Sequence, residues 1–188
     1  MDASRPPLEQ AGTVHLTAAV LVPGAEAWEP IQAIRREHDP QVRRWMPHIT
    51  LLYPFVPEGR LAEAAARLAP AAAGVAPFEL ALREFRWFPH GRRATVWLHP
   101  QPPQAVARLQ ARLQAALPWC DALSRFAGGF TPHLSVGRVA RNEAEALAAR
   151  LAASWRPVRF AVREVALIAR SGRPGEPFRV RTTVPLGR

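Results

Sequence analysis

Two short segments of the chain repeat one arrangement of residues that can move protons. His48 stands two residues before Thr50, and His133 stands two residues before Ser135, each in an apolar run that follows a proline. Such a run is typical of a β-strand, where side chains alternate between faces, so each histidine and its hydroxyl project from the same side. Two such pairs, 85 positions apart (133 − 48), predict two half-sites that meet around one substrate.

The residue types in these pairs suit the cleavage of a cyclic phosphodiester. The reaction needs a base that activates water or a hydroxyl and an acid that protonates the departing oxygen. Two histidines that titrate near neutral pH can divide those tasks. A hydroxyl beside each histidine can donate a hydrogen bond to a non-bridging phosphate oxygen. The candidate catalytic residues are therefore His48, His133, Thr50 and Ser135, and the sequence leaves open which histidine is the base.

The composition argues against metal, disulfide and lysine chemistry. No carboxylate cluster and no histidine spacing is typical of a metal site, and the single cysteine, Cys120, excludes an internal disulfide and a cysteine-built metal site. All 25 basic residues are arginine, so ligases that form a lysine adduct, Schiff-base enzymes and P-loop NTPases are excluded. We expect a site without metal or cofactor.

The remaining histidines are weaker candidates. His15 also stands two residues before a threonine, Thr17, but no proline precedes it and the matching place in the second half has no histidine. Its role stays open. His90 and His99 stand beside prolines at predicted turns, and we assign them no role.

Arg138 is a candidate ligand of the substrate phosphate. It stands five residues after His133, so strand alternation alone puts it on the opposite face. It reaches the phosphate only if the strand ends or bulges at Gly137, which is a common role of a strand glycine. A surface arginine is the alternative interpretation.

Three aromatic residues are further candidates for substrate contact. Tyr53 and Trp45 flank the first motif, where each can stack on a base or pack in the core. Phe130 belongs to a long loop over 118–131 that leads into the second motif. Long loops of this kind are often functional, so we expect a flap that contacts the substrate.

Length and charge set the broad class. The 188 residues are 48% hydrophobic, which is enough for one domain or two small fused lobes. The formal net charge of +10 creates a field that attracts polyanions such as RNA, although a solvated basic surface explains it equally well. No apolar run is long enough to span a bilayer. We expect a cytoplasmic protein that has no membrane association and needs no protein partner.

Hydrophobic spacing predicts the order strand, helix, strand, helix, strand twice, followed by a closing strand. The expected strands cover 14–22, 48–54, 78–88, 94–99, a run from His133, 158–168 and 178–185; the expected helices cover 25–38, 59–73, 103–117 and a segment that begins at an N-cap, Asn142. We predict an α+β fold in one domain over residues 1–188. It is duplicated and two-lobed (about 14–90 and 91–186), with two antiparallel sheets facing a central cleft and helices on the outside.

The two motifs, His48-Ile49-Thr50-Leu51 and His133-Leu134-Ser135-Val136, resemble the paired signatures of the 2H phosphoesterase superfamily. Within it, the chain is most similar to bacterial 2′-5′ RNA ligase and RNA 2′,3′-cyclic phosphodiesterase proteins. The stretch from Pro132 to Arg138 is especially close to the second family motif, and the resemblance in element order runs over about 14–185. Residues 52–55 depart from the glycine turn of better-known members, so the natural substrate stays open.

The resemblance implies a metal-independent phosphoesterase that hydrolyses, or reversibly forms, 2′-linked or cyclic phosphodiesters. The implied substrates are 2′,3′-cyclic phosphate ends of RNA or cyclic nucleotides, and hydrolysis leaves a 2′-phosphate. One alternative is a nucleotide- or RNA-binding module without turnover; two titratable groups favour an enzyme over that module. Another is a cyclic phosphodiesterase for a small metabolite, such as a cyclic phosphate of ADP-ribose. A basic groove would favour RNA, and a closed pocket would favour the metabolite.

Overall fold

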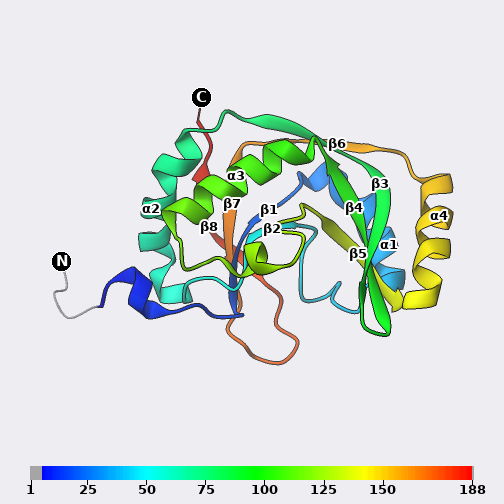
Figure 1. Ribbon diagram of the computed structural model, residues 1–188, viewed down its shortest axis with the longest axis horizontal. Helices are drawn as coiled ribbons and strands as arrows, with labels where there is room; N and C mark the ends of the chain where they lie inside the picture. Colours follow the sequence, from blue (N-terminus) through cyan, green and yellow to red (C-terminus); the bar gives the residue numbers. More distant parts are fainter. Residues whose placement is uncertain (1–5, 188) are drawn as a thin grey trace.

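The computed structural model describes residues 6–187 and consists of two antiparallel four-stranded sheets with helices packed on them (Figure 1). The first sheet has the order β2-β1-β7-β8 and the second has the order β5-β4-β3-β6. The predicted α+β fold with two antiparallel sheets is therefore confirmed.

The elements have the following bounds. In the first sheet the strands are β1 (Thr17–Leu21), β2 (Ile49–Leu52), β7 (Glu164–Ala169) and β8 (Arg179–Pro185). In the second sheet they are β3 (Phe78–His90), β4 (Arg93–Gln101), β5 (Leu134–Ala140) and β6 (Val158–Val162). The α-helices are α1 (Trp28–His38), α2 (Leu61–Ala73), α3 (Pro103–Ala116) and α4 (Ala144–Ser154).

The single strand predicted over 158–168 is wrong, because this stretch forms two strands in different sheets. β6 pairs with β3 in the second sheet, whereas β7 lies between β1 and β8 in the first. The burial patterns differ accordingly: β6 alternates between buried and exposed residues, as a strand with one covered face does, and β7 is buried on both faces after its first residue. The change of pattern falls at Arg163, where the chain leaves one sheet for the other.

The predicted helix start at Asn142 is also wrong. Residues 141–143 form a 3₁₀ turn, and α4 begins after it without a side-chain cap. The first strand starts at Thr17, because Val14 makes only an isolated bridge to Phe55. These are shifts of a few residues that leave the order of elements intact.

Each sheet takes strands from both the 14–90 and the 91–186 stretches of the chain. β3 joins β4 in the second sheet, and β7 and β8 complete the first sheet around β1. α2 packs on β8 and β7, and α4 packs on β3 and β4, so each sheet has its own covering helix. The two motif strands, β2 and β5, lie at the edges of different sheets.

The helix α1 connects the two sheets. Although it directly follows β1 and its short 3₁₀ turn, α1 packs mainly against β5 of the second sheet. The two elements lie close together at Gly137, where an added Cβ would lie 2.9 Å from the Cβ of His38. This contact brings the end of α1, and the segment that leads from it to β2, beside the second motif.

Candidate active site

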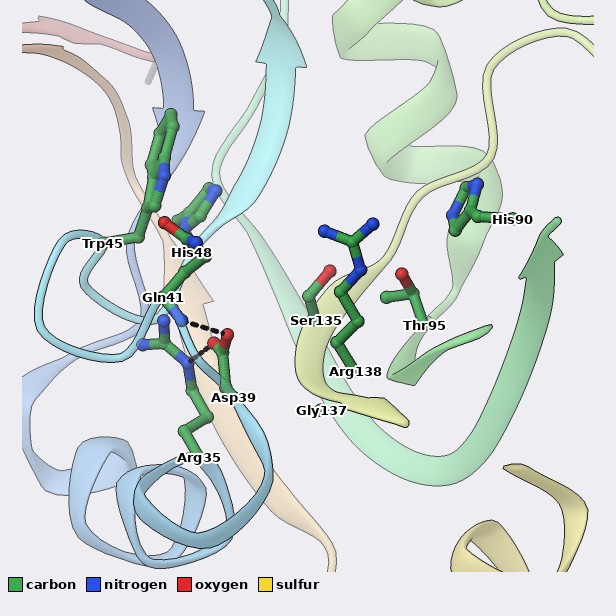
Figure 2. A pocket seen from close by; sticks show the side chains of 10 residues that line it. All are labelled: Arg35, Asp39, Gln41, Trp45, His48, His90, Thr95, Ser135, Gly137 and Arg138. Atoms are coloured by element: carbon green, nitrogen blue, oxygen red, sulfur yellow. Dashed lines mark hydrogen bonds and ion pairs between the residues drawn. The ribbon is translucent and has the colours of Figure 1, made fainter. Parts of the chain in front are cut away.

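A cavity of about 430 Å³ lies between the end of α1 and the second sheet (Figure 2). One wall comes from α1 and the segment before β2: Arg35, Asp39, Gln41, Trp45 and His48. The other wall comes from the second sheet: His90, Thr95, Ser135, Gly137 and Arg138. One histidine of the first motif and the hydroxyl of the second motif therefore share this cavity, as two meeting half-sites require.

The two motif histidines are held by the same hydrogen bond. Nδ1 of His48 lies 2.7 Å from the carbonyl oxygen of Met46, and Nδ1 of His133 lies 2.8 Å from that of Thr131. A carbonyl oxygen only accepts, so Nδ1 carries the hydrogen in each ring. The neutral ring then keeps its lone pair on Nε2, where it can accept a proton from a substrate or water.

Aromatic rings orient both imidazoles. The His48 ring stacks on Trp45 with centroids 4.7 Å apart, and Trp45 stacks in turn on Phe178 at 3.8 Å. The His133 ring makes T-shaped contacts with Phe88 and Trp97, with ring centroids 5.1 and 5.9 Å apart. Each ring is thus fixed by one backbone carbonyl and by neighbouring aromatic side chains.

The electrostatic surroundings of the two histidines differ. The pKa of His48 is lowered to about 4, mainly by burial; the hydrogen bond to Met46 opposes the shift, and the charges of Arg35 and His133 contribute to it. Burial also lowers the pKa of His133, with a smaller contribution from His90. The influence of His133 on His48 means that the two rings are within electrostatic reach of each other. A bound phosphate adds negative charge and favours protonation of one ring.

The two motif hydroxyls lie on strand faces that turn away from the core. Thr50 is half-buried, whereas its neighbours Ile49 and Leu51 are fully buried. Ser135 is likewise half-buried and lines the cavity. Thr50 and His133 are not part of the cavity lining.

A β-bulge turns Arg138 toward the cavity. Ser135 pairs with Trp97 and Arg138 pairs with Thr95, while Val136 is the extra residue between the paired positions. Because Trp97 and Thr95 are two apart on β4, their side chains share a face, and so do Ser135 and Arg138 although they are three apart. The sequence required an end or a bulge at Gly137; the bulge falls one residue earlier, at Val136, and Ser135 and Arg138 both line the cavity (Figure 2).

The three aromatic candidates for substrate contact differ in whether they line the cavity. Trp45 lines the cavity, but Tyr53 and Phe130 do not. Tyr53 packs against Trp45 and His15, and its hydroxyl donates a hydrogen bond to the His15 carbonyl at 3.4 Å. Phe130 packs partly buried against the main core. The loop over 118–131 contains a short 3₁₀ turn that contacts β2.

Sequence reasoning missed Arg35, Asp39 and Gln41. Arg35 is only 2% exposed, and its Nε donates to Oδ2 of Asp39 at 2.9 Å while Nη1 donates to Oε1 of Gln32 at the same distance. The other oxygen of Asp39, Oδ1, accepts the backbone N–H of Gln41 at 2.8 Å. A signal for Arg35 exists in the sequence: it follows Ile31 by four positions and so falls on the apolar stripe of the helix, where an unpaired arginine would be costly.

His90 was also missed as a cavity residue, because β3 extends to it, two residues beyond the predicted end of the strand. His99 is buried beside Trp97 and is not in the lining. Within residues 6–187, no cluster of three or more histidine, cysteine or acidic residues has the arrangement of a metal site. None of the helices in this range is long and apolar enough to cross a membrane.

The two antiparallel sheets carry one histidine–hydroxyl motif each, at the start of β2 and of β5. The family model of the 2′-5′ RNA ligase superfamily matches residues 23–174, which include both motifs. The chain therefore belongs to this superfamily, and the predicted relationship to 2H phosphoesterases is confirmed. Comparison with curated protein sequences gives no match.

Solved structures show the same fold at low sequence identity. E. coli LigT complexed with 3′-AMP is 22% identical, with a TM-score of 0.60, 94% of this chain covered and 100% of LigT. The TT0787 protein of Thermus thermophilus is 19% identical, with a TM-score of 0.65 and coverage of 92% and 99%. A structure described as a phosphoesterase is 21% identical, with a TM-score of 0.63 and coverage of 93% and 99%.

Proposed function

We propose that the protein is a metal-independent phosphoesterase that opens 2′,3′-cyclic phosphates at the ends of RNA or in cyclic nucleotides. The observation that carries this proposal is the matched pair of motif histidines, each with Nδ1 bonded to a carbonyl oxygen and Nε2 left for a substrate. Membership of the 2′-5′ RNA ligase superfamily supports a phosphoesterase or ligase. The solved complex of LigT with 3′-AMP supports a nucleotide as the kind of substrate.

In the proposed reaction, His48 is the base and His133 is the acid. Nε2 of His48 accepts a proton from water as the water oxygen bonds to phosphorus, and Nε2–H of His133 gives a proton to the departing 3′ oxygen, which leaves a 2′-phosphate. The burial of His48 and the nearby charge of Arg35 support this assignment, because both disfavour the protonated form. If the hydroxyl of another RNA end replaces water, the same proton transfers join two ends without ATP.

The side chains around the histidines bind the phosphate in this proposal. Thr50 and Ser135 donate hydrogen bonds to the non-bridging oxygens, and Arg138, beside Ser135, offsets the charge that develops on them. Trp45 holds the ring of His48 by stacking. Tyr53 and Phe130 act at a distance from the reacting atoms, as supports of Trp45 and of the loop before the second motif.

The test is hydrolysis of 2′,3′-cyclic-phosphate-ended RNA and of free cyclic nucleotides in EDTA. We expect wild-type turnover to survive EDTA and to fall about a hundredfold or more in His48→Asn and in His133→Asn. His15→Asn is the matched control, because this histidine also precedes a threonine by two residues but lies outside the cavity lining. Turnover that neither motif substitution affects would overturn the proposal. Binding without turnover would favour the nucleotide-binding module.

A further inference from the structure

We propose that the cavity beside the motif histidines is a nucleobase pocket, in which Gln41 and the Arg35–Asp39 pair bind the edge of a base that carries an exocyclic amino group. The inference rests on the proposed function, since the base in question belongs to the nucleotide whose cyclic phosphate lies between the histidines. Adenine, cytosine and guanine carry such an amino group, and uracil does not.

The position of the cavity relative to the motifs indicates which part of the substrate occupies it. His48 and Ser135 line the cavity, but it extends away from them to the end of α1 (Figure 2). A phosphate held by both motifs would therefore lie at one side of the cavity, with the attached nucleoside inside it. A volume of about 430 Å³ is near the small end of ligand pockets and suits one nucleoside better than a longer chain.

The charges of the wall formed by α1 and the following segment argue against a second phosphate there. Among the described residues that line this wall, Arg35 is the one arginine, and its guanidinium is already paired with Asp39 at 2.9 Å. The carboxylate of Asp39 lines the cavity as well and would repel an anion. Arg138, on the opposite wall beside Ser135, is committed to the reactive phosphate. The charges of Arg35 and Asp39 cancel, so this wall has no net charge from the pair and suits an uncharged polar ring.

The hydrogen-bonding groups of this wall match the edge of an amino-bearing base. The side-chain amide of Gln41 offers a donor and an acceptor in one plane, the pattern that binds adenine with two hydrogen bonds. Each carboxylate oxygen of Asp39 accepts one bond from the chain and keeps a lone pair for an amino group. Where cytosine carries its 4-amino group, uracil carries the O4 carbonyl, which a carboxylate repels, so that only N3–H, between two carbonyl oxygens, remains as a donor on this edge. Because Arg35 and the Gln41 backbone fix Asp39, the wall is preorganised for this discrimination.

The experiment compares kcat/KM for the 2′,3′-cyclic phosphates of adenosine, cytidine, guanosine and uridine. We expect the uridine compound to be the poorest substrate of the wild type, by about tenfold. Gln41→Ala should lower kcat/KM for the amino-bearing substrates and reduce that difference to about twofold, and Asp39→Asn should raise the relative rate with uridine. Gln104→Ala, which removes an exposed glutamine of α3 outside the cavity, is the matched control and should keep the wild-type preference.

The outcomes separate this inference from the proposed function. Turnover with equal kcat/KM for all four compounds, or a preference that Gln41→Ala leaves unchanged, would overturn the nucleobase pocket and leave the phosphoesterase intact. Absence of turnover with every compound would count against the phosphoesterase. In that case the dissociation constants of the four nucleoside 2′-monophosphates test the pocket: weaker binding of the uridine compound supports it, and equal binding overturns it.

Discussion

His48 and His133 share one hydrogen bond but have unequal surroundings. Both donate Nδ1–H to the carbonyl oxygen two residues earlier, so the motif itself makes them equivalent. What distinguishes them comes from elsewhere in the chain: Trp45 stacks on His48, and Arg35 of α1 is close enough to affect its charge. The proposed division into base and acid therefore depends on α1 and the segment after it, and not on the motifs.

This difference predicts how the free enzyme responds to pH. Since the pKa of His48 is lowered to about 4, the ring is neutral and able to accept a proton above that pH, so the acidic limb of the kcat/KM profile should lie near it, while deprotonation of His133, the proposed acid, sets the alkaline limb. Arg35→Gln removes a positive charge near His48 and leaves Asp39 unpaired, and both changes raise the pKa. The acidic limb should therefore move to higher pH.

Histidine NMR titration and the pH profile of kcat/KM measure this shift directly. Arg36→Gln is the control, because Arg36 is the next residue on α1 but is exposed and paired with Glu29. An acidic limb that stays in place in Arg35→Gln would show that Arg35 does not act on the base.

The stack of Trp45 on His48 predicts a positioning role for the indole. Trp45→Ala should lower kcat about tenfold with a smaller change in KM, because a ring that can rotate spends less time aligned with the substrate. Trp45→Phe keeps a stacking surface and should restore most of kcat. If Trp45→Ala instead raised KM at constant kcat, the indole would bind substrate and would not position His48.

At the scale of elements, the close packing of α1 on β5 determines the shape of the site. Gly137 leaves no room for a methyl group, because an added Cβ would lie 2.9 Å from the Cβ of His38. We expect Gly137→Ala to lower the free energy of unfolding by about 1–3 kcal/mol, since helix and strand must move apart. Gly128→Ala is the control in denaturant unfolding, because nothing lies within 4 Å of its added Cβ. Equal stabilities would mean that α1 tolerates the displacement.

The sequence predicted those features of the fold and site that depend on local spacing. Alternation and helical periodicity identified the motif strands, and the two His-x-Thr/Ser segments identified the candidate catalytic pairs. The face of Arg138 depended on a bulge, which arises from the register with β4 and has no strict local signature. Arg35 and Gln41 entered the site because α1 crosses to the other sheet. Such a contact between distant segments is invisible in hydrophobic spacing.

At the scale of the whole molecule, the two sheets form one unit because each contains strands from both halves of the chain. The first sheet is completed by β7 and β8 from the end of the chain, and the second contains β3 from its first half. A stretch cut at residue 90 would expose the face of β1 that Ala166, Ile168 and Phe178 cover. The cavity near the motifs therefore depends on segments that lie far apart along the described residues 6–187, and its geometry is coupled to the stability of both sheets.

The net charge of +10 gives the whole molecule a field whose effect depends on how many phosphates a substrate carries. An RNA end brings several phosphates into that field, so its kcat/KM should fall steeply between about 50 and 200 mM salt, whereas a cyclic mononucleotide with one phosphate should lose only a few-fold. Measuring both substrates with one enzyme preparation makes the mononucleotide the internal control. A steeper salt dependence for RNA would mean that arginines beyond the cavity bind the chain of the substrate. Parallel salt dependences would mean that only the reactive phosphate is bound by charge, and would favour the small metabolite as substrate.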